Sequence, residues 1–169
     1  MLGNTKSHKI GLAFVAMLVL AGCSKSEKPD LLAQGEGGNS ATQVAPGTER
    51  DFIVNVGDRI YFLVDQTTLT PEGRETLTRQ AQWLNQYPNV TIQVEGHADE
   101  RGTREYNIAL SAQRSTATRE FLISQGVNAQ RIATLAYGKE RPVALCDAES
   151  CWAQNRRAVT AITGGASPG

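Results

Sequence analysis

The chain has 169 residues, with 17 basic and 17 acidic side chains, which is enough for one domain of ordinary size and a tail. Its balanced charge offers no basic face for nucleic acid, so nucleic-acid binding is excluded as the main function.

The N-terminal segment has the pattern of an export signal. A basic stretch over residues 6–9 precedes an apolar run over 10–20, which is about half as long as a membrane-spanning helix. The Leu-Ala-Gly-Cys motif at 20–23 follows directly and resembles a bacterial lipobox, whose cysteine is lipidated and becomes the first mature residue. We therefore predict a signal peptide over 1–22 and a lipid anchor on Cys23. An ordinary signal peptide with a cysteine at its cleavage site is the alternative.

The segment after the anchor is predicted to be a tether. Residues 23–50 begin with Cys23 and are rich in Gly, Ser, Pro, Gln and Glu without an apolar period, which is typical of a disordered linker. Ser24 resembles the sorting signal for the outer membrane, so the domain is expected to face the periplasm from that membrane. The mature chain keeps 15 basic and 17 acidic residues, a net charge of −2, which argues against charge-driven binding to anionic membranes.

From residue 51 the composition is that of a folded domain, which we expect to end at residue 164 before a disordered tail over 165–169. Strands are indicated by β-branched and aromatic residues, and helices by capping residues and helical spacing. In chain order we predict strands over 52–54 and 59–64, a helix from Thr70 to Tyr87, and a strand over 90–94. A second helix is predicted over 103–125, with an apolar stripe of Tyr106, Leu110, Ala117 and Phe121. A strand over 132–137, a short helix over 149–155 and a strand over 158–163 complete the domain. Strands alternating with helices predict an α/β fold (an α+β sandwich), with a βαβαββ-type mixed sheet of about four strands and two or three helices packed on it.

Cys146 and Cys151 lie close together in the second half of the domain. Export would place them in an oxidising compartment, where disulfides persist, so a loop-closing disulfide is the leading interpretation. Two cysteines without a nearby histidine are too few for a structural zinc site. We therefore expect no metal and no cofactor apart from the covalent lipid on Cys23.

The densest polar cluster is Glu-Gly-His-Ala-Asp-Glu-Arg-Gly-Thr over 95–103, between a predicted strand and a predicted helix. Strand-to-helix loops are where α/β folds place binding groups, beside the free N–H groups of the helix start. His97 is the single histidine of the mature chain, which is too few for a hydrolytic zinc site, and no nucleophile-elbow motif is present. We therefore expect a binding protein and not an enzyme, with His97 as a hydrogen-bonded core or loop residue.

Several separated motifs together carry a family resemblance. They are the string over 95–107, Arg114, Tyr137-Gly138, Arg141-Pro142 and Asn155-Arg156-Arg157. In this order they resemble the OmpA-like C-terminal domain family over about residues 55–163. The lipobox and linker resemble in particular the peptidoglycan-associated lipoproteins of that family, so residues 51–164 would form an OmpA-like peptidoglycan-binding domain.

The resemblance implies that the domain binds peptidoglycan without cleaving it, through the diaminopimelate of the peptide stem. By position, Asp99 would hold the ligand's ammonium group and Arg114 its carboxylate, which suits the chemistry of both side chains. Asn107 and the segment from Leu63 to Asp65 match further pocket positions, and Leu63 stands where the family often has Asp. The alternative is that Asp99 and Arg114 form a structural ion pair.

The same resemblance implies partners in the Tol system, TolB among them, and a tether between outer membrane and cell wall that serves envelope integrity and cell division. The alternative is a protein-interaction module for TolB with weak wall binding. For Asn155, Arg156 and Arg157 two roles remain: they line the pocket, or they cap the short helix and pair with carboxylates such as Asp65. We favour the structural role.

Overall fold

The computed structural model describes residues 44–168. The predicted signal peptide (1–22), the lipidation site Cys23 and most of the predicted linker (23–50) lie outside the described residues. Within the described range, no helix is both long and apolar enough to cross a membrane.

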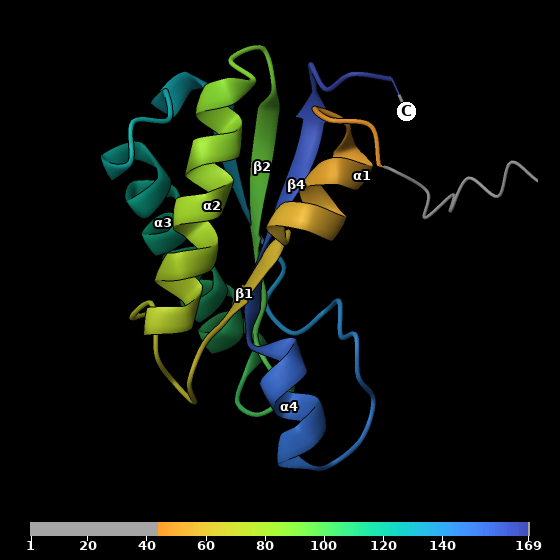
Figure 1. Ribbon diagram of the computed structural model, residues 1–169. Helices are drawn as coiled ribbons and strands as arrows, with labels where there is room; N and C mark the ends of the chain where they lie inside the picture. Colours follow the sequence, from red (N-terminus) through yellow and green to blue (C-terminus); the bar gives the residue numbers. More distant parts are fainter. Residues whose placement is uncertain (1–43, 169) are drawn as a thin grey trace, which may run out of the picture. The chain divides into compact units, whose positions relative to one another are not determined.

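A four-stranded mixed sheet in the order β1-β4-β2-β3 forms the centre of the domain (Figure 1). Its strands are β1 (Arg59–Tyr61), β2 (Thr91–Gly96), β3 (Ile132–Ala136) and β4 (Arg157–Gly164). β2 pairs parallel with β3, whereas β4 pairs antiparallel with both β1 and β2. The last strand of the sequence is therefore inserted between two earlier, mutually parallel strands, and the predicted mixed sheet is confirmed.

Two long helices, α2 (Pro71–Gln86) and α3 (Arg104–Ser124), lie side by side against the sheet (Figure 1). Both begin at capping threonines: the Thr70 hydroxyl accepts the Gly73 N–H at 3.0 Å, and the Thr103 hydroxyl accepts the Tyr106 N–H at 3.2 Å. A short helix, α4 (Glu149–Asn155), precedes β4 and covers the predicted range 149–155.

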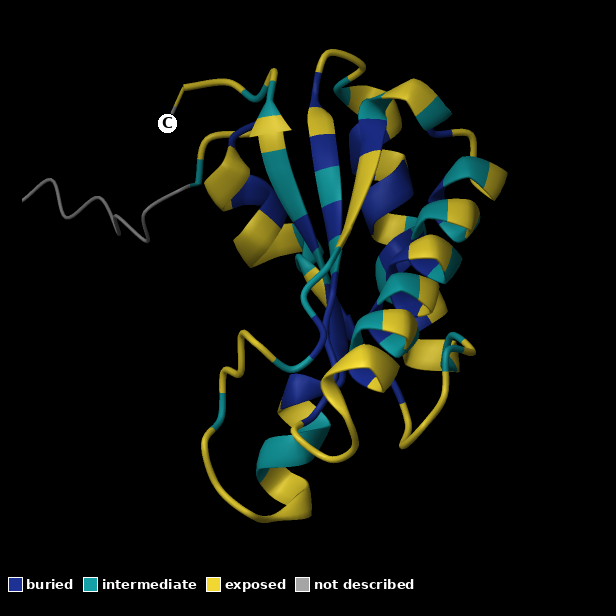
Figure 2. Cartoon of the chain, turned by 180° about the vertical axis from the view of Figure 1, so that it is seen from behind, coloured by how far each residue is buried: buried dark blue, intermediate teal, exposed yellow. Residues whose placement is uncertain are grey.

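The hydrophobic core lies between the sheet and these helices, and Figure 2 shows buried segments concentrated there. Phe52 and Trp83 pack with ring centroids 4.9 Å apart. The Trp83 indole N–H donates to the buried Asp51 carboxylate at 2.8 Å, which ties the first helical turns to α2. The fully buried apolar side chains are Phe52, Leu77, Leu84, Val94 and Leu122.

The predicted strand over residues 52–54 is wrong, because this segment is helical. Helix α1 (Glu49–Asp51) continues into a π-helical turn, η1 (Phe52–Val56). The Thr48 hydroxyl caps it by accepting the Asp51 N–H at 3.1 Å. Phe52 faces the core, whereas Ile53 and Val54 are 45% and 61% exposed. Three consecutive apolar residues do not by themselves separate a strand from a helical turn.

The predicted apolar stripe of α3 is only partly correct: of its members, Phe121 packs partly buried against the core. The buried face of α3 is mostly polar, and Tyr106 of the predicted stripe is 48% exposed. The buried residues of this helix are Asn107, Ser111, Arg114, Ser115, Thr118 and Leu122. The serine and threonine hydroxyls among them donate to helix carbonyls: Ser111 to Ile108 O at 3.0 Å and Thr118 to Arg114 O at 2.9 Å. Because these polar groups are satisfied, small side chains can let the helix lie close to the sheet.

The packed structure extends past both predicted domain boundaries. Thr48 is buried, and it forms an isolated bridge with Ser167. The Ser167 N–H donates to Gly47 O at 3.0 Å, and Ala166 packs against the core. Residues 44–50 and 165–168 therefore contact one another as part of the folded unit.

Candidate functional site

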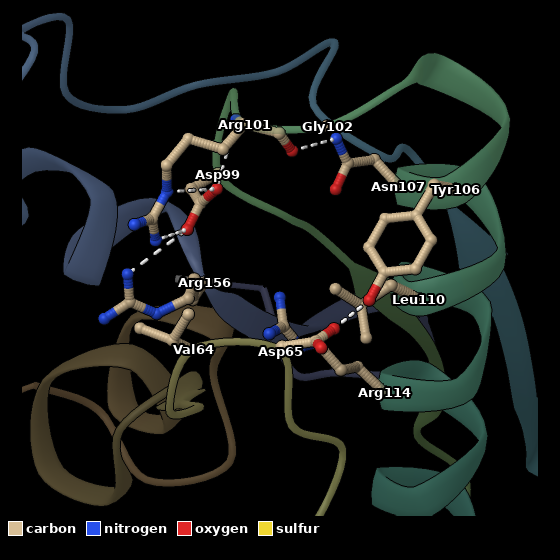
Figure 3. A pocket seen from close by; sticks show the side chains of 10 residues that line it. All are labelled: Val64, Asp65, Asp99, Arg101, Gly102, Tyr106, Asn107, Leu110, Arg114 and Arg156. Carbon is tan, nitrogen blue, oxygen red and sulfur yellow. Dashed lines mark hydrogen bonds and ion pairs between the residues drawn. The ribbon is translucent and has the colours of Figure 1, made fainter.

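A pocket of about 230 Å³ opens between the β2–α3 loop, α3, the segment after β1 and the end of α4 (Figure 3). Its lining residues are Val64, Asp65, Asp99, Arg101, Gly102, Tyr106, Asn107, Leu110, Arg114 and Arg156. Four of the five predicted site residues are thus brought together in one pocket. The fifth, Leu63, is 56% exposed and its side chain faces a neighbouring groove.

Arg114 is the most deeply buried charge of the site, with 0% of the residue exposed. Its guanidinium donates to three backbone carbonyls: Gln66 O at 2.9 Å, His97 O at 2.9 Å and Leu63 O at 3.2 Å. Leu63 therefore contributes to the site through its backbone. Burial lowers the pKa of Arg114 to about 10, so the group stays charged at neutral pH. Since an arginine has five N–H donors, two are not used by these three bonds.

Asp99 is 7% exposed and accepts hydrogen bonds from two arginines. Arg101 donates its backbone N–H at 3.2 Å, its Nε at 3.2 Å and its Nη2 at 2.6 Å, and Arg156 donates Nη1 at 3.2 Å. Burial alone would raise the pKa of Asp99, but the hydrogen bonds from Arg101 and Arg156 outweigh it and hold this pKa below its ordinary value. Asp99 is therefore a carboxylate at neutral pH.

The alternative of a mutual ion pair between Asp99 and Arg114 does not describe this geometry. Among the ion pairs of residues 44–168, those of Asp99 are with Arg101 and Arg156. Arg114 is held by backbone carbonyls instead. Both charges line the pocket without neutralising each other directly.

Arg156 lines the pocket and also holds a carboxylate, so the two roles considered for it coincide. It donates to Asp99, to Glu149 and, at 3.1 Å, to Phe62 O. The predicted pairing of Arg156 with Asp65 is wrong, because Asp65 instead accepts a hydrogen bond from the Tyr106 hydroxyl.

The two neighbours of Arg156 in the sequence have structural contacts. Arg157 is buried and donates to Arg141 O at 3.1 Å. The Asn155 side chain bonds the backbone of the preceding loop, accepting from Val143 N at 2.8 Å and donating to Ala144 O at 2.8 Å. These two residues fix the loop before α4.

The helix side of the pocket is formed by Asn107 and Tyr106. Asn107 is 1% exposed and donates to Arg101 O at 2.8 Å, which fixes the loop that carries Asp99. Asp65, the partner of Tyr106, has a φ of 55°, a left-handed conformation that Asp tolerates better than most residues. Figure 3 shows Arg101 and Arg156 on one side of the pocket and these helix residues on the other.

Sequence reasoning missed Arg101, Gly102, Tyr106 and Leu110 as pocket residues. For two of them a signal was available, because Tyr106, Leu110 and Arg114 recur at four-residue spacing and so share one helix face. The contact between Arg101 and Asp99 has no such periodic signal.

Helix α4 forms an outer wall beside the pocket. A disulfide joins Cys146 to Cys151, with their Cα atoms 5.7 Å apart, and closes the loop that enters this helix. The Arg101 guanidinium lies 4.3 Å from the centre of the Trp152 ring. The Trp152 indole N–H donates to Glu100 at 2.7 Å. The helix thus contacts the β2–α3 loop through an aromatic ring stacked on a pocket arginine.

His97 lies beneath the site without a hydrogen bond to either ring nitrogen from any described residue. It is 2% exposed, and its ring stacks on Tyr137 with centroids 5.3 Å apart. The expected side-chain hydrogen bond is therefore not present, and the imidazole is held by packing. Its role in the site is through its backbone carbonyl, which accepts from Arg114.

This buried imidazole predicts a loss of stability in mild acid. Burial, assisted by Arg157, Arg141 and Arg59, lowers the pKa of His97 from 6.5 to about 4. The unfolded chain therefore binds more protons between these values, so the His97 contribution is complete above pH 6.5 and is lost as pH falls toward 4. The expected loss is about 3 kcal/mol at most. Urea denaturation at pH 7, 6 and 5 measures it, and His97→Gln should flatten the profile; an equally steep profile in that variant contradicts the assignment.

Comparison with known proteins places this chain in a family. A family model described as "OmpA family" matches residues 61–156. The chain is 55% identical over 160 residues to the peptidoglycan-associated lipoprotein of Mesorhizobium japonicum, covering 95% of each chain. It is 56% identical over 162 residues to the protein of that name from Rhizobium meliloti, covering 95% of this chain and 90% of the relative.

Solved structures agree with these matches. The peptidoglycan-associated lipoprotein of Burkholderia pseudomallei superposes with a TM-score of 0.61 at 39% identity, over 63% of this chain and 90% of that one. The C-terminal domain of Helicobacter pylori MotB has a TM-score of 0.60 at 23% identity, over 63% and 84%, a likeness of fold alone. The chain therefore belongs to the OmpA family and, within it, to the peptidoglycan-associated lipoproteins.

Proposed function

We propose that this protein binds peptidoglycan non-covalently, without cleaving it, through the diaminopimelate residue of the peptide stem. One observation carries the proposal: a buried carboxylate, Asp99, and a buried guanidinium, Arg114, line the same pocket of about 230 Å³. The free end of diaminopimelate bears an ammonium and a carboxylate on one carbon. A site with one fixed charge of each sign matches such a zwitterion, since Asp accepts from ammonium and Arg donates to carboxylate.

The name shared by the relatives, peptidoglycan-associated lipoprotein, supports the same ligand. With lipid on Cys23 and the linker over 23–50, wall binding would tether the outer membrane to the cell wall. The family resemblance further supports a place in the Tol system, with TolB as protein partner, in envelope integrity and cell division. We propose wall binding as the primary activity because the pocket geometry favours it directly.

A pull-down on purified sacculi tests this function. Asp99→Asn keeps the shape of the side chain but removes its charge, and should weaken binding about tenfold or more, since a charge-assisted hydrogen bond contributes roughly 1.5–3 kcal/mol. Glu75→Gln is the matched control, because Glu75 lies on α2 outside the pocket with its side chain 77% exposed. Thermal melting of each variant separates lost binding from lost folding. Folded Asp99→Asn protein that binds sacculi as well as wild type would refute the proposal.

A further inference from the structure

The acceptor capacity of Asp99 is already filled in the unliganded pocket. A carboxylate offers about four lone-pair positions for hydrogen bonds. Three are occupied by N–H groups of Arg101 and one by Arg156. An incoming ammonium group therefore meets a carboxylate without an open acceptor position, and one of the resident donors must leave before it can bind.

The two resident arginines differ in their freedom to leave. The Arg156 side chain is 5% exposed and is fixed by further bonds to Phe62 O and Glu149. The Arg101 side chain is 40% exposed, and the hydrogen bonds that its guanidinium donates both go to Asp99. Movement of the Arg101 guanidinium would free positions on both carboxylate oxygens while leaving Arg156 in place.

An alternative position for the Arg101 guanidinium lies next to the one that it occupies. Its Nη2 atom is 4.0 Å from a carboxylate oxygen of Glu149. Its guanidinium already stacks on the ring of Trp152 at 4.3 Å. Both residues belong to α4, whose entry loop is closed by the disulfide, so a small shift toward α4 would exchange one carboxylate for another and keep the aromatic contact.

We propose that the Arg101 guanidinium occupies the ammonium subsite in the unliganded protein and competes with the ligand's ammonium group for Asp99. This competition lowers the affinity of every ligand that uses the subsite. This rests on the function proposed above. Every ligand must displace the Arg101 guanidinium from Asp99. A zwitterionic end offsets that displacement by also binding the two remaining N–H donors of Arg114, whereas a ligand with ammonium alone gains nothing there. Arg101 therefore lowers the affinity of both kinds of ligand by the same factor. The added contact with Arg114 lets a zwitterionic end bind in spite of this loss, whereas a cationic side chain without the adjacent carboxylate, such as the lysine of lysine-type wall peptides, has nothing to offset it.

Calorimetry with two stem tetrapeptides, one with diaminopimelate and one with lysine at the third position, tests the proposal. Because Arg101 competes equally with both, Arg101→Ala should tighten both by the same factor, about fivefold for a partly exposed ion pair. Arg104→Ala is the matched control: Arg104 is three residues further on, is 68% exposed, and does not line the pocket. It should leave both affinities unchanged.

A second readout follows the arginine itself. In wild-type protein, the diaminopimelate peptide should shift the NMR signal of the Arg101 Nε–H, assigned by its absence from Arg101→Ala, because that N–H leaves Asp99. Unchanged or weaker binding by Arg101→Ala, or an Arg101 signal that does not move, overturns the proposal. Asp99→Asn separates the two hypotheses: if it binds the peptide like wild type, the proposed function fails. If it loses binding while Arg101→Ala gains none, only the role of Arg101 fails.

Discussion

Replacing Arg114 by alanine is expected to abolish wall binding and to destabilise the domain by about 3–6 kcal/mol. The side chain is fully buried, and its removal leaves the carbonyls of Gln66 and His97 without the Arg114 donor. The Leu63 carbonyl loses one of two donors, since it also accepts the Gln66 N–H at 3.2 Å. Hydrogen bonds from a charged donor contribute roughly 1.5–3 kcal/mol each, and these three share one residue, so their loss is not additive. A domain stabilised by about 5–15 kcal/mol would lose a large part of its margin. Urea denaturation at neutral pH measures the change.

Two further variants separate charge from geometry. Arg114→Lys keeps the positive charge but replaces the planar fork by a single ammonium group, so it should recover part of the stability and little of the binding. Arg119→Ala is the matched control on the same helix, because Arg119 donates to Ile132 O and Ala129 O, both at 3.2 Å, and does not line the pocket. It should lower stability modestly and leave sacculus binding intact. An Arg114→Ala protein as stable as wild type would disprove the role in folding.

The elements that the sequence predicted well are those specified by local chemistry. Thr70 with Pro71, and Thr103, are capping signals within one turn of the helices they start. Gly126, with a φ of 94°, directly follows the predicted helix range 103–125, as a glycine commonly does where a helix ends. The range 52–54 failed because its three apolar residues fit a strand or a helical turn equally well, and only the contact of Phe52 with Trp83 decides.

The residues that gather at the site could be predicted from the sequence, but their hydrogen-bond and ion-pair partners could not. The motif over 95–107 and Arg114 predicted pocket residues because the family resemblance assigns ligand-binding positions to them. The partners of Asp99 were not predictable, because Arg156 is 57 positions away in the sequence and reaches the carboxylate only through the fold. The three carbonyls that hold Arg114 are backbone groups, which no side-chain pattern identifies.

The buried face of α3 is polar because of Gly96, at the end of β2, which is visible in the sequence. A Cβ atom placed on this residue would lie 1.9 Å from the backbone carbonyl oxygen of Ser111. The helix therefore contacts the strand backbone directly. Such close packing leaves no room for large apolar side chains at this point, and Ser111, whose hydroxyl accepts the Gly138 N–H at 2.9 Å, occupies it instead.

Gly96→Ala is therefore expected to destabilise the domain by about 3 kcal/mol or more, at the upper end of overpacking effects. The clash is with main-chain atoms, so α3 must move away from β2 as a body. That movement would also displace Asn107 and Arg114 relative to Asp99, and binding to sacculi should fall together with stability. Thermal melting and the sacculus pull-down measure the two effects on the same protein.

The matched control for this prediction is Gly164→Ala at the end of β4. A Cβ atom there would meet only the side-chain hydroxyl of Thr91 at 3.2 Å, which can rotate away. Its stability should change by less than about 1 kcal/mol, and its binding should match wild type, because Gly164 does not line the pocket. If Gly96→Ala proved as mild as Gly164→Ala, α3 would be free to shift on the sheet. The spacing between Arg114 and Asp99 would then have to be maintained by the loop bonds of Asn107 and Arg114 alone, and not by the helix–strand contact.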